Sequence, residues 1–361
     1  MECSSLESLS PINLSSAVKL QLSGCSSLGS FPEITEKMNN LRRLYLYGLS
    51  IAELPWASFQ NLCRLKRLHL TRCGAVQLPS RIFTELGLII FKAEWCEGLH
   101  WPDLEVGEEP LTIEFLTISD CNLSDDFFDK GFQRFSRVKK LNLTGNNFTF
   151  LPKCINKLQL LKHLDVHDCY HLREIRGIPP QLKYLNAANC ESLSCSSKSM
   201  VIKEQKRHEL EGYFRFPGES VSDWFHQRST GLPCSFWFRD KFPLGILCCT
   251  VVGQKNDDDY DYLYFIPEVF INGKLGKRFI EYEMSWTNLD HTYFHLLEAL
   301  NSDNDHLKKG WNHAELLYYF EQRGKVRMKE VGIHVMMEGG SMTEDVRFSD
   351  PSRKRKLDDF I

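Results

Sequence analysis

The sequence has 361 residues, of which 42% are hydrophobic and 25% charged, and its formal net charge is −3. This composition is typical of a folded globular protein, and the nearly balanced charge argues against nucleic acid or a membrane surface as the partner. The longest apolar run, residues 244–253, has about half the length of a membrane-spanning helix. We therefore expect a cytoplasmic protein that does not enter the membrane.

A pattern of leucine pairs recurs through the first half of the chain, and each pair is followed three residues later by a cysteine, an asparagine or a leucine. The ladder positions, as we call these last residues, are 21 to 25 residues apart: Cys25, Leu49, Cys73, Cys96, Cys121, Asn146, Cys169 and Cys190. This period and pattern are the signature of leucine-rich repeats. Each pair predicts a short strand with its leucines in the core, and each ladder residue is expected inside the following turn.

The predicted fold of residues 1–197 is an α/β leucine-rich-repeat solenoid, a horseshoe with a parallel concave sheet. It would contain about eight repeats, the first of them truncated. Residues beside the leucines would face outward on this sheet, where Tyr, Arg and His suit a protein interface. The candidate partner-binding residues are Arg43, Tyr45, Arg67, His69, Lys92, Glu94, Lys140, Asn142, His163, Asp165, Tyr184 and Asn186.

The 13 cysteines could indicate disulfides, a metal site or buried thiols. Their number is odd, and the spacings lack the close pairs of zinc sites. Since six of them occupy ladder positions, we interpret these six as reduced thiols in the core of the solenoid.

After Leu193 the repeat period ends and the composition changes. Residues 198–212 are predicted to be a linker that includes about one helical turn, and residues 213–348 contain aromatic and β-branched runs separated by turn residues. An all-β sandwich of antiparallel strands is expected there. The predicted strands are residues 235–238, 245–252, 262–271, 279–286, 314–321 and 331–337.

No phosphate-binding loop, nucleophile elbow or HExxH motif occurs in the sequence. His291, His295 and Glu298 would share one face of a helix, as zinc ligands can, but the same stretch also fits a strand and no fourth ligand is evident. Asp257 to Asp261 lack the pattern of a calcium loop. We expect no metal, no cofactor and no enzymatic activity.

The last segment, residues 349–361, is a basic tail that contains Arg353, Lys354, Arg355 and Lys356. The cluster could act as a nuclear localisation signal or be a solvated tail. Asp358 and Asp359 follow it closely, which disfavours binding to nucleic acid.

Two parts of the sequence resemble plant intracellular immune receptors of the TIR, nucleotide-binding and leucine-rich-repeat type. Residues 24–28 (GCSSL) and 44–55 resemble their repeats. Residues 217–231 (PGESVSDWFHQRSTG) resemble the opening of their C-terminal jelly-roll/Ig-like domain, the C-JID, and residues 245–253, 290–291, 311–321 and 326–337 follow in that domain's order. Ser222-Asp223 depart from the Pro-Glu usual before Trp224, and Val331 stands where a cysteine is common.

The resemblance implies recognition of a pathogen effector protein by the repeats together with the jelly-roll/Ig-like sandwich. In these receptors a nucleotide-binding module and TIR domains signal, and this sequence carries the motifs of neither. Cys3 lies 22 residues before Cys25 without room for its strand, so we expect the C-terminal part of a larger receptor or a truncated gene product. The alternatives are a scaffold or adaptor that binds a constant host protein, and a hydrolase or metal enzyme within residues 213–348.

Overall fold

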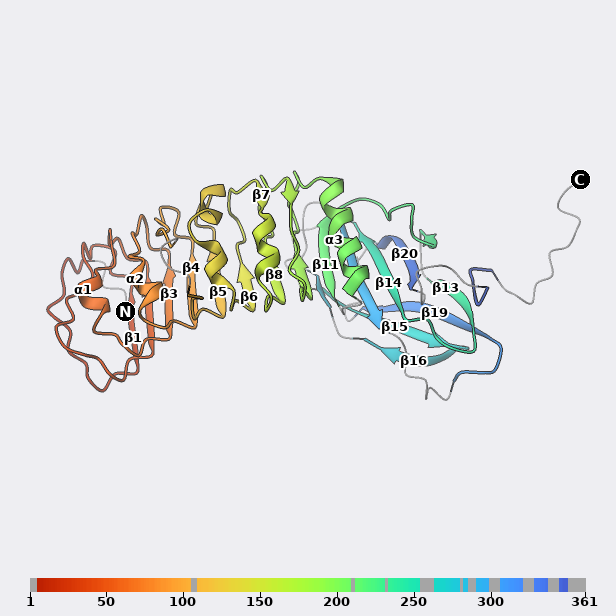
Figure 1. Cartoon of the computed structure of the whole chain (residues 1–361), viewed down its shortest axis with the longest axis horizontal. Coiled ribbons are helices and arrows are strands. Elements are labelled where there is room, and N and C mark those ends of the chain that lie inside the picture. The colour runs from red at the N-terminus through yellow and green to blue at the C-terminus, as the bar shows by residue number, and fades with distance from the viewer. Residues whose placement is uncertain are drawn as a thin grey trace, which may run out of the picture. The chain divides into compact units, whose positions relative to one another are not determined.

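The computed structural model describes residues 5–104, 109–208, 212–230, 233–253, 263–279, 282–284, 290–298, 306–320, 328–336 and 344–349. The chain divides into two compact units, Met1–Leu210 and Glu211–Ile361 (Figure 1). Within the described ranges, no helix is both long and apolar enough to cross a membrane. The predictions for Cys3, for Asp257 to Asp261 and for Arg353 to Lys356 concern residues outside these ranges.

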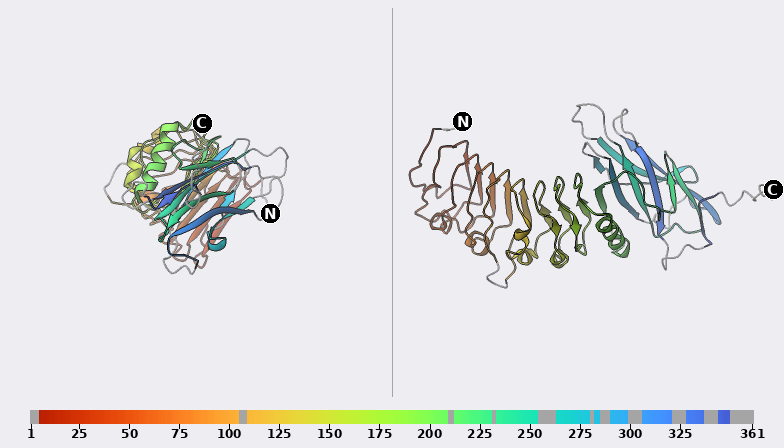
Figure 2. Two further views of the ribbon diagram at one scale, coloured as in Figure 1. Left: turned by 90° about the vertical axis from the view of Figure 1, so that its right-hand side faces the viewer. Right: turned by 90° about the horizontal axis from the view of Figure 1, so that it is seen from above.

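The first unit is built on a parallel sheet, which confirms the predicted solenoid of leucine-rich repeats (Figure 2). Every strand pairs in parallel with its neighbour in the next repeat, because each repeat returns the chain to the same side of the stack. In order, the strands are β1 (Lys19–Ser23), β2 (Arg43–Tyr47), β3 (Arg67–Thr71), β4 (Ile90–Glu94), β5 (Phe115–Ser119), β6 (Lys140–Asn142), β8 (His163–Asp165) and β10 (Tyr184–Asn186).

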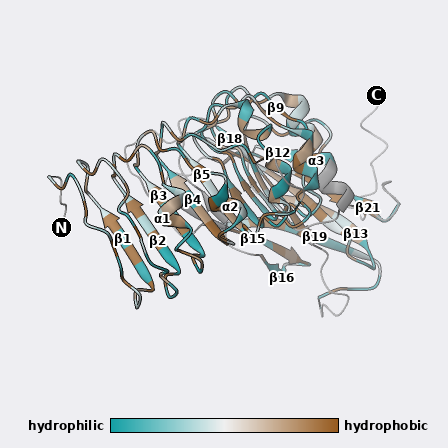
Figure 3. Cartoon of the chain, turned by 60° about the vertical axis from the view of Figure 1, so that its left-hand side comes forward, coloured by the Kyte–Doolittle hydropathy of each residue, from teal (hydrophilic) through white to brown (hydrophobic). Residues whose placement is uncertain are grey.

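Alternation of side chains along each strand places the leucines in the core. In β2, Leu44 and Leu46 are buried, whereas Arg43 and Tyr47 are exposed. Figure 3 shows the same alternation as hydrophobic and hydrophilic bands on β1 and β2. Leu44 lies opposite Leu68 of β3, so the leucines of successive repeats form one continuous apolar column.

The ladder residues satisfy backbone carbonyl groups inside the solenoid. The Cys169 thiol donates to the Leu143 carbonyl at 3.3 Å, and the Cys190 thiol to the Val166 carbonyl at 3.1 Å. Burial raises the pKa of Cys169 to about 12, so its thiol stays protonated and can donate. These contacts confirm the interpretation of the ladder cysteines as core thiols.

The side of the repeats opposite the sheet holds short elements and a cluster of aromatic rings. Its elements are α1 (Trp56–Phe59), α2 (Arg81–Thr84), η1 (Asp125–Phe128), η2 (Phe132–Phe135), η3 (Lys153–Lys157), and the paired strands β7 (Phe150–Leu151) and β9 (Glu174–Ile175). Trp101 is central to the ring cluster, with its centroid 5.0 Å from that of Phe83 and 5.2 Å from that of Phe127. Helix content is therefore lower than the predicted α/β class implies.

The predicted linker contains more helix than the single turn expected, since residues 195–208 form the helix α3 (Cys195–His208). Ser194 caps its first turn, because the Ser194 hydroxyl accepts from the Ser197 N–H at 3.3 Å. Val201 and Ile202 are buried, and the Ser197 hydroxyl accepts from the Ile175 N–H at 2.9 Å. Packing against β9 thus stabilises a serine-rich stretch whose sequence pattern indicated a helix only weakly.

The second unit is made of two antiparallel sheets. One has the order β11-β18-β14-β20-β12, and the other has the order β16-β15-β19-β13-β21, with β17 beside β15. The strands are β11 (Tyr213–Pro217), β12 (Gln227–Ser229), β13 (Cys234–Arg239), β14 (Gly245–Val252), β15 (Leu263–Ile271), β16 (Lys274–Arg278), β17 (Tyr282–Met284), β18 (His291–Glu298), β19 (Trp311–Phe320), β20 (Met328–Met336) and β21 (Val346–Arg347). Each of the six predicted strands has its counterpart here, while the assignment as a jelly-roll/Ig-like sandwich stays a prediction.

A buried polar chain links the two sheets of this unit. The Thr250 hydroxyl of β14 donates to the Tyr318 hydroxyl of β19 at 2.9 Å. The Tyr318 oxygen lies 3.1 Å from Nε2 of His295, which belongs to β18. Burial lowers the pKa of His295 to about 3, so its ring is neutral near pH 7.

The segment with the receptor-like motif packs on β20. The Val221 N–H donates to the Glu330 carboxylate at 2.7 Å, and the Val335 N–H donates to Nδ1 of His226 at 3.1 Å. A Cβ atom at Gly332 would lie 2.4 Å from Cγ1 of Val221. This close approach requires glycine at position 332.

Candidate protein-binding face of the repeats

The outward side chains of the parallel sheet form rows that run across the repeats. We call this surface the sheet face. Its first row contains Lys19, Arg43, Arg67, Ile90, Phe115, Lys140, His163 and Tyr184, and its middle row contains Gln21, Tyr45, His69, Lys92, Thr117, Asn142, Asp165 and Asn186.

The register corrects one pair of predicted residues. Lys92 lies opposite His69 as predicted, but Glu94 lies opposite Thr71 in a third row, and Ile90 is the neighbour of Arg67. The pair Lys92 and Glu94 forms a salt bridge of 2.7 Å.

The first repeats carry an aromatic and basic surface. The rings of Tyr45 and His69 meet edge to face with centroids 4.8 Å apart, and the Lys19 ammonium lies 4.8 Å from the Tyr45 centroid. Burial, followed by the positive charge of Lys92, lowers the pKa of His69. The His69 ring is therefore neutral at pH 7, and Lys19, Arg43 and Arg67 carry the positive charge here.

The last repeats differ because their middle-row residues bond to the backbone. Asn142, Asp165 and Asn186 each accept, through Oδ1, from the N–H group two residues later, at 2.9, 3.2 and 3.1 Å. This Asx turn ends β6, β8 and β10 after three residues, whereas β1 to β5 have five. Asn186 is also buried, which corrects its prediction as an exposed residue.

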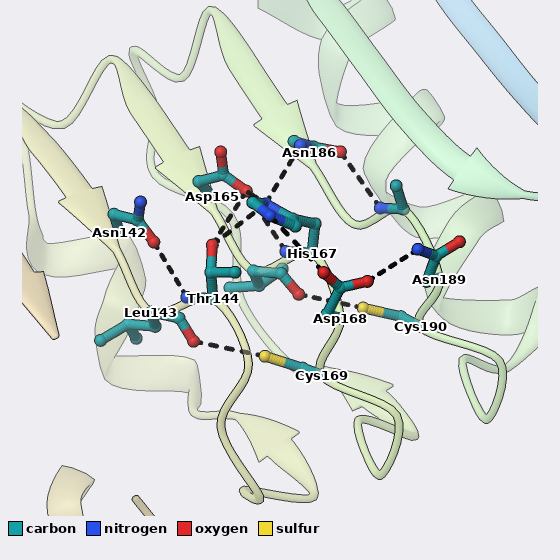
Figure 4. Close-up of polar contacts among 12 residues, drawn as sticks. Asn142, Leu143, Thr144, Asp165, His167, Asp168, Cys169, Asn186, Asn189 and Cys190 are labelled. Atoms are coloured by element: carbon teal, nitrogen blue, oxygen red, sulfur yellow. Dashed lines mark hydrogen bonds and ion pairs between the residues drawn. The ribbon is translucent and has the colours of Figure 1, made fainter. Parts of the chain in front are cut away.

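His167 joins these turns into one polar cluster, shown in Figure 4. Its Nδ1 atom lies 2.6 Å from Oδ1 of Asp165 and 3.0 Å from the Thr144 hydroxyl. Asp168 accepts from the Asn189 amide at 2.7 Å. These side chains hold one another in place, so Asn142, Asp165 and Asn186 have a structural role that single-strand periodicity could not reveal.

The other predicted residues of the last repeats lie in the first row. Lys140 is exposed, and the rings of His163 and Tyr184 are 5.9 Å apart between centroids. Burial, followed by the positive charges of Lys140 and Lys162, lowers the pKa of His163. This part of the sheet face presents a second aromatic pair, with less positive charge than the first repeats.

A further row, missed in the sequence, lies immediately after the strands. The residue before each ladder position has a positive φ angle, and we call this set the left-handed row: Gly24, Gly48, Arg72, Trp95, Asp120, Gly145, Asp168 and Asn189. In every member of this row before Asn189, the N–H group bonds to the next repeat, as Arg72 does to the Glu94 carbonyl at 2.8 Å. The glycines at 24, 48 and 145 were the feature of the sequence that could have predicted this row, since glycine adopts a positive φ angle freely.

Three exposed side chains meet at this row. The guanidinium carbon of Arg72 lies 5.5 Å from the centroid of Trp95, and Arg72 Nη1 donates to the Tyr47 hydroxyl at 3.3 Å. Tyr47 is 40% exposed and Trp95 is 51% exposed. We call Tyr47, Arg72 and Trp95 the edge cluster.

The candidate zinc ligands His291, His295 and Glu298 would share one face only on a helix. Residues 291–298 instead form the strand β18. A strand does not bring positions seven residues apart onto one face. His291 and His295 are buried, and the His295 ring contacts Tyr318. Among the described residues, no group of three His, Cys, Asp or Glu side chains is placed to hold a metal ion.

Sequence comparisons find relatives among plant disease resistance proteins. TMV resistance protein N of Nicotiana glutinosa is 28% identical over 342 residues, which cover 69% of this chain and 30% of that protein. Disease resistance protein RPS4B of Arabidopsis thaliana is 29% identical over 310 residues, covering 71% of this chain and 25% of that protein. The chain thus spans less than a third of the length of these curated relatives.

A solved structure, the leucine-rich repeat domain of the type III effector XCV3220 (XopL), aligns with a TM-score of 0.42 at 20% identity, covering 49% of this chain and 70% of that one. The family model of the leucine-rich repeats of RPS4B-like disease resistance proteins matches residues 13–208. That match covers more than half of the sequence and the whole parallel sheet. The chain therefore belongs to the family of leucine-rich repeats found in RPS4B-like disease resistance proteins.

Proposed function

We propose that the chain is the recognition region of a plant intracellular immune receptor and binds a pathogen effector protein without catalysing a reaction. The sheet face of the repeats and the C-terminal sheets, as a jelly-roll/Ig-like sandwich, would form the binding region. Signalling would depend on the TIR and nucleotide-binding modules of such receptors. This role places the protein in the cytoplasm, with the nucleus as a further destination if the basic tail acts as an import signal.

One observation carries the proposal, namely the side chains that the first repeats present on the sheet face. Tyr45 and Arg43 lie on β2, and their neighbours His69 and Arg67 lie on β3. The two strands pair without a break in register. Aromatic and Arg side chains supply a large share of the energy in protein interfaces. A rigid parallel sheet holds them in place, so little conformational entropy is lost on binding.

The test is a binding assay between this chain and a panel of pathogen effectors, with a variant that carries Tyr45→Ala, Arg67→Ala and His69→Ala. We expect an effector from the panel to bind the unchanged chain and the variant to lose this binding by at least about a hundredfold. Thermal unfolding should change little, because these side chains lie outside the leucine core.

The matched control replaces Gln60 and Arg64, two exposed residues outside the sheet, with alanine. It should bind as the unchanged chain does. If the triple variant keeps its affinity, the sheet face is not the binding surface. If only a constant host protein binds, the chain is an adaptor and the proposed receptor role is wrong.

A further inference from the structure

The edge cluster extends the sheet face beyond the ends of three strands. Tyr47 ends β2, Arg72 follows β3 and Trp95 follows β4, so each side chain comes from a different repeat. The guanidinium of Arg72 lies between the two aromatic groups, 5.5 Å from the Trp95 centroid and bonded to the Tyr47 hydroxyl. Two exposed aromatic rings and one Arg in mutual contact have the composition of an interface hot spot.

The backbone under this cluster shows that the fold does not require these residue types. Arg72 has φ 52° and Trp95 has φ 53°, a conformation that is unfavourable for large L-residues. Gly24, Gly48 and Gly145 occupy the same place in other repeats, with φ angles of 60° to 68°. Glycine would build the same turn without strain, so the turn itself does not require the side chains of Arg72 and Trp95.

The first row of β1 to β3 carries positive charge only, whereas Glu94 and Asp120 lie beside Trp95 at the other end of the strands. Lys19, Arg43 and Arg67 lie side by side in the first row of the sheet face. On the outward positions of β1 to β3, all of which the structure describes, there is no carboxylate, and Glu94 of β4 is paired with Lys92 at 2.7 Å. Complementary potential steers an oppositely charged partner to such a surface.

We infer that the edge cluster and the basic row Lys19, Arg43 and Arg67 form a docking surface for an acidic segment of a protein partner. Carboxylates of the segment pair with the basic row, and an aromatic or aliphatic anchor packs on Trp95 and Tyr47. The inference rests on the proposed function for the partner being a protein. It adds the chemistry by which that partner is recognised.

The probe is a phage-displayed library of random 12-residue peptides, selected on the immobilised full chain. We expect the enriched peptides to be net acidic and to contain an aromatic or large aliphatic residue. A synthetic peptide of the enriched sequence should bind at least about tenfold more weakly to the variants Arg72→Gly and Trp95→Gly. Its affinity should also fall as the salt concentration rises, because surface charge pairs are screened.

The chain offers a matched control with the same chemistry elsewhere. Arg81 lies 5.4 Å from the Trp56 centroid, on the helices α1 and α2. Trp56→Ala and Arg81→Ala should leave the affinity of the peptide unchanged. Since glycine fits positions 72 and 95, loss of binding in those variants with an unchanged or higher unfolding temperature supports the inference.

Enrichment of neutral or basic peptides would overturn the inference, as would an unchanged affinity for Trp95→Gly. The outcomes separate it from the proposed function. Acidic peptides that bind the edge cluster support it even if no effector binds the chain. Effector binding that survives Arg72→Gly and Trp95→Gly overturns it and leaves the receptor role intact.

Discussion

In the left-handed row, the same residue position sets the backbone conformation of a turn and presents a side chain next to the sheet face. The turn after each strand needs a positive φ angle so that its N–H group bonds to the next repeat. Glycine meets that need at Gly24, Gly48 and Gly145, and Asp or Asn does so at Asp120, Asp168 and Asn189. Arg72 and Trp95 meet it at a cost in free energy.

That cost can be measured by exchanging residue types at equivalent positions. Trp95→Gly should raise the free energy of unfolding by about 0.5 kcal/mol, since relief of the left-handed strain exceeds the added entropy of the unfolded chain. Gly48→Ala should lower it by about 1 kcal/mol, because a Cβ atom there meets nothing within 4 Å and only the strain remains. Urea unfolding measures both, and a shift of the same sign in both variants would contradict the account.

The Asn146 side chain forms hydrogen bonds to several backbone groups of the turns. Its amide donates to the carbonyls of Ile118 and Leu143 at 2.7 and 2.8 Å, and its Oδ1 accepts from the N–H groups of Cys121 and Leu123 at 3.3 and 2.9 Å. One side chain thus satisfies backbone groups of two successive repeats.

Asn146→Leu should lower the free energy of unfolding by about 3 kcal/mol, because several buried backbone groups lose their partner. Asn146→Cys should cost less, since a thiol at the neighbouring ladder positions donates to the corresponding carbonyl. Urea unfolding of the two variants gives the comparison. Equal losses would show that the cost comes from packing rather than from the hydrogen bonds.

At the scale of elements, packing between segments decides which sequence patterns become regular structure. Val201 and Ile202 of the helix α3 are buried and its Ser197 hydroxyl accepts from the Ile175 N–H of β9, although the helix is rich in Ser and Lys. In the second unit, Val221 and Phe225 of the motif segment lie against Gly332 of β20. Both cases depend on a small number of contacts between distant parts of the chain.

Gly332→Ala tests the second of these contacts. A Cβ atom would lie 2.4 Å from Cγ1 of Val221 and 3.2 Å from the Phe225 ring, so the motif segment must move. We expect a loss of about 2 kcal/mol in the free energy of unfolding. The double variant Val221→Ala, Gly332→Ala should recover part of it, and additive losses in the double variant would refute the steric explanation.

At the scale of the whole molecule, the second unit has an acid-sensitive core. Burial holds the pKa of His295 at about 3, whereas the unfolded chain has the ordinary value of 6.5. Between these values the unfolded state binds a proton that the folded state does not. The free energy of unfolding therefore falls as the pH is lowered from 6.5 towards 3, by up to about 1.4 kcal/mol per pH unit.

The variant His295→Gln removes this titration and keeps a polar side chain beside Tyr318. Between pH 7 and pH 5, the unchanged chain should lose about 2 kcal/mol more than the variant in urea unfolding. Parallel pH profiles for the two proteins would show that His295 does not carry the acid sensitivity.

The sequence by itself determined the repeat strands, the buried ladder thiols and the strand segments of the second unit. These features depend on residues close together in the chain, such as Leu44, Leu46 and Leu49, so periodicity alone identifies them. Strand parity also identifies outward positions such as Tyr45 and His69, because it does not depend on the neighbouring strands.

Only the tertiary structure decided which residues meet between repeats. The edge cluster joins residues 47, 72 and 95, and the Asx turns with His167 tie the side chains of Asn142, Asp165 and Asn186 to the backbone. In the second unit β14 pairs with β18 and β20, which come much later in the chain. Stacking and sheet pairing create these contacts, and their energy depends on three-dimensional fit rather than on any pattern within one repeat.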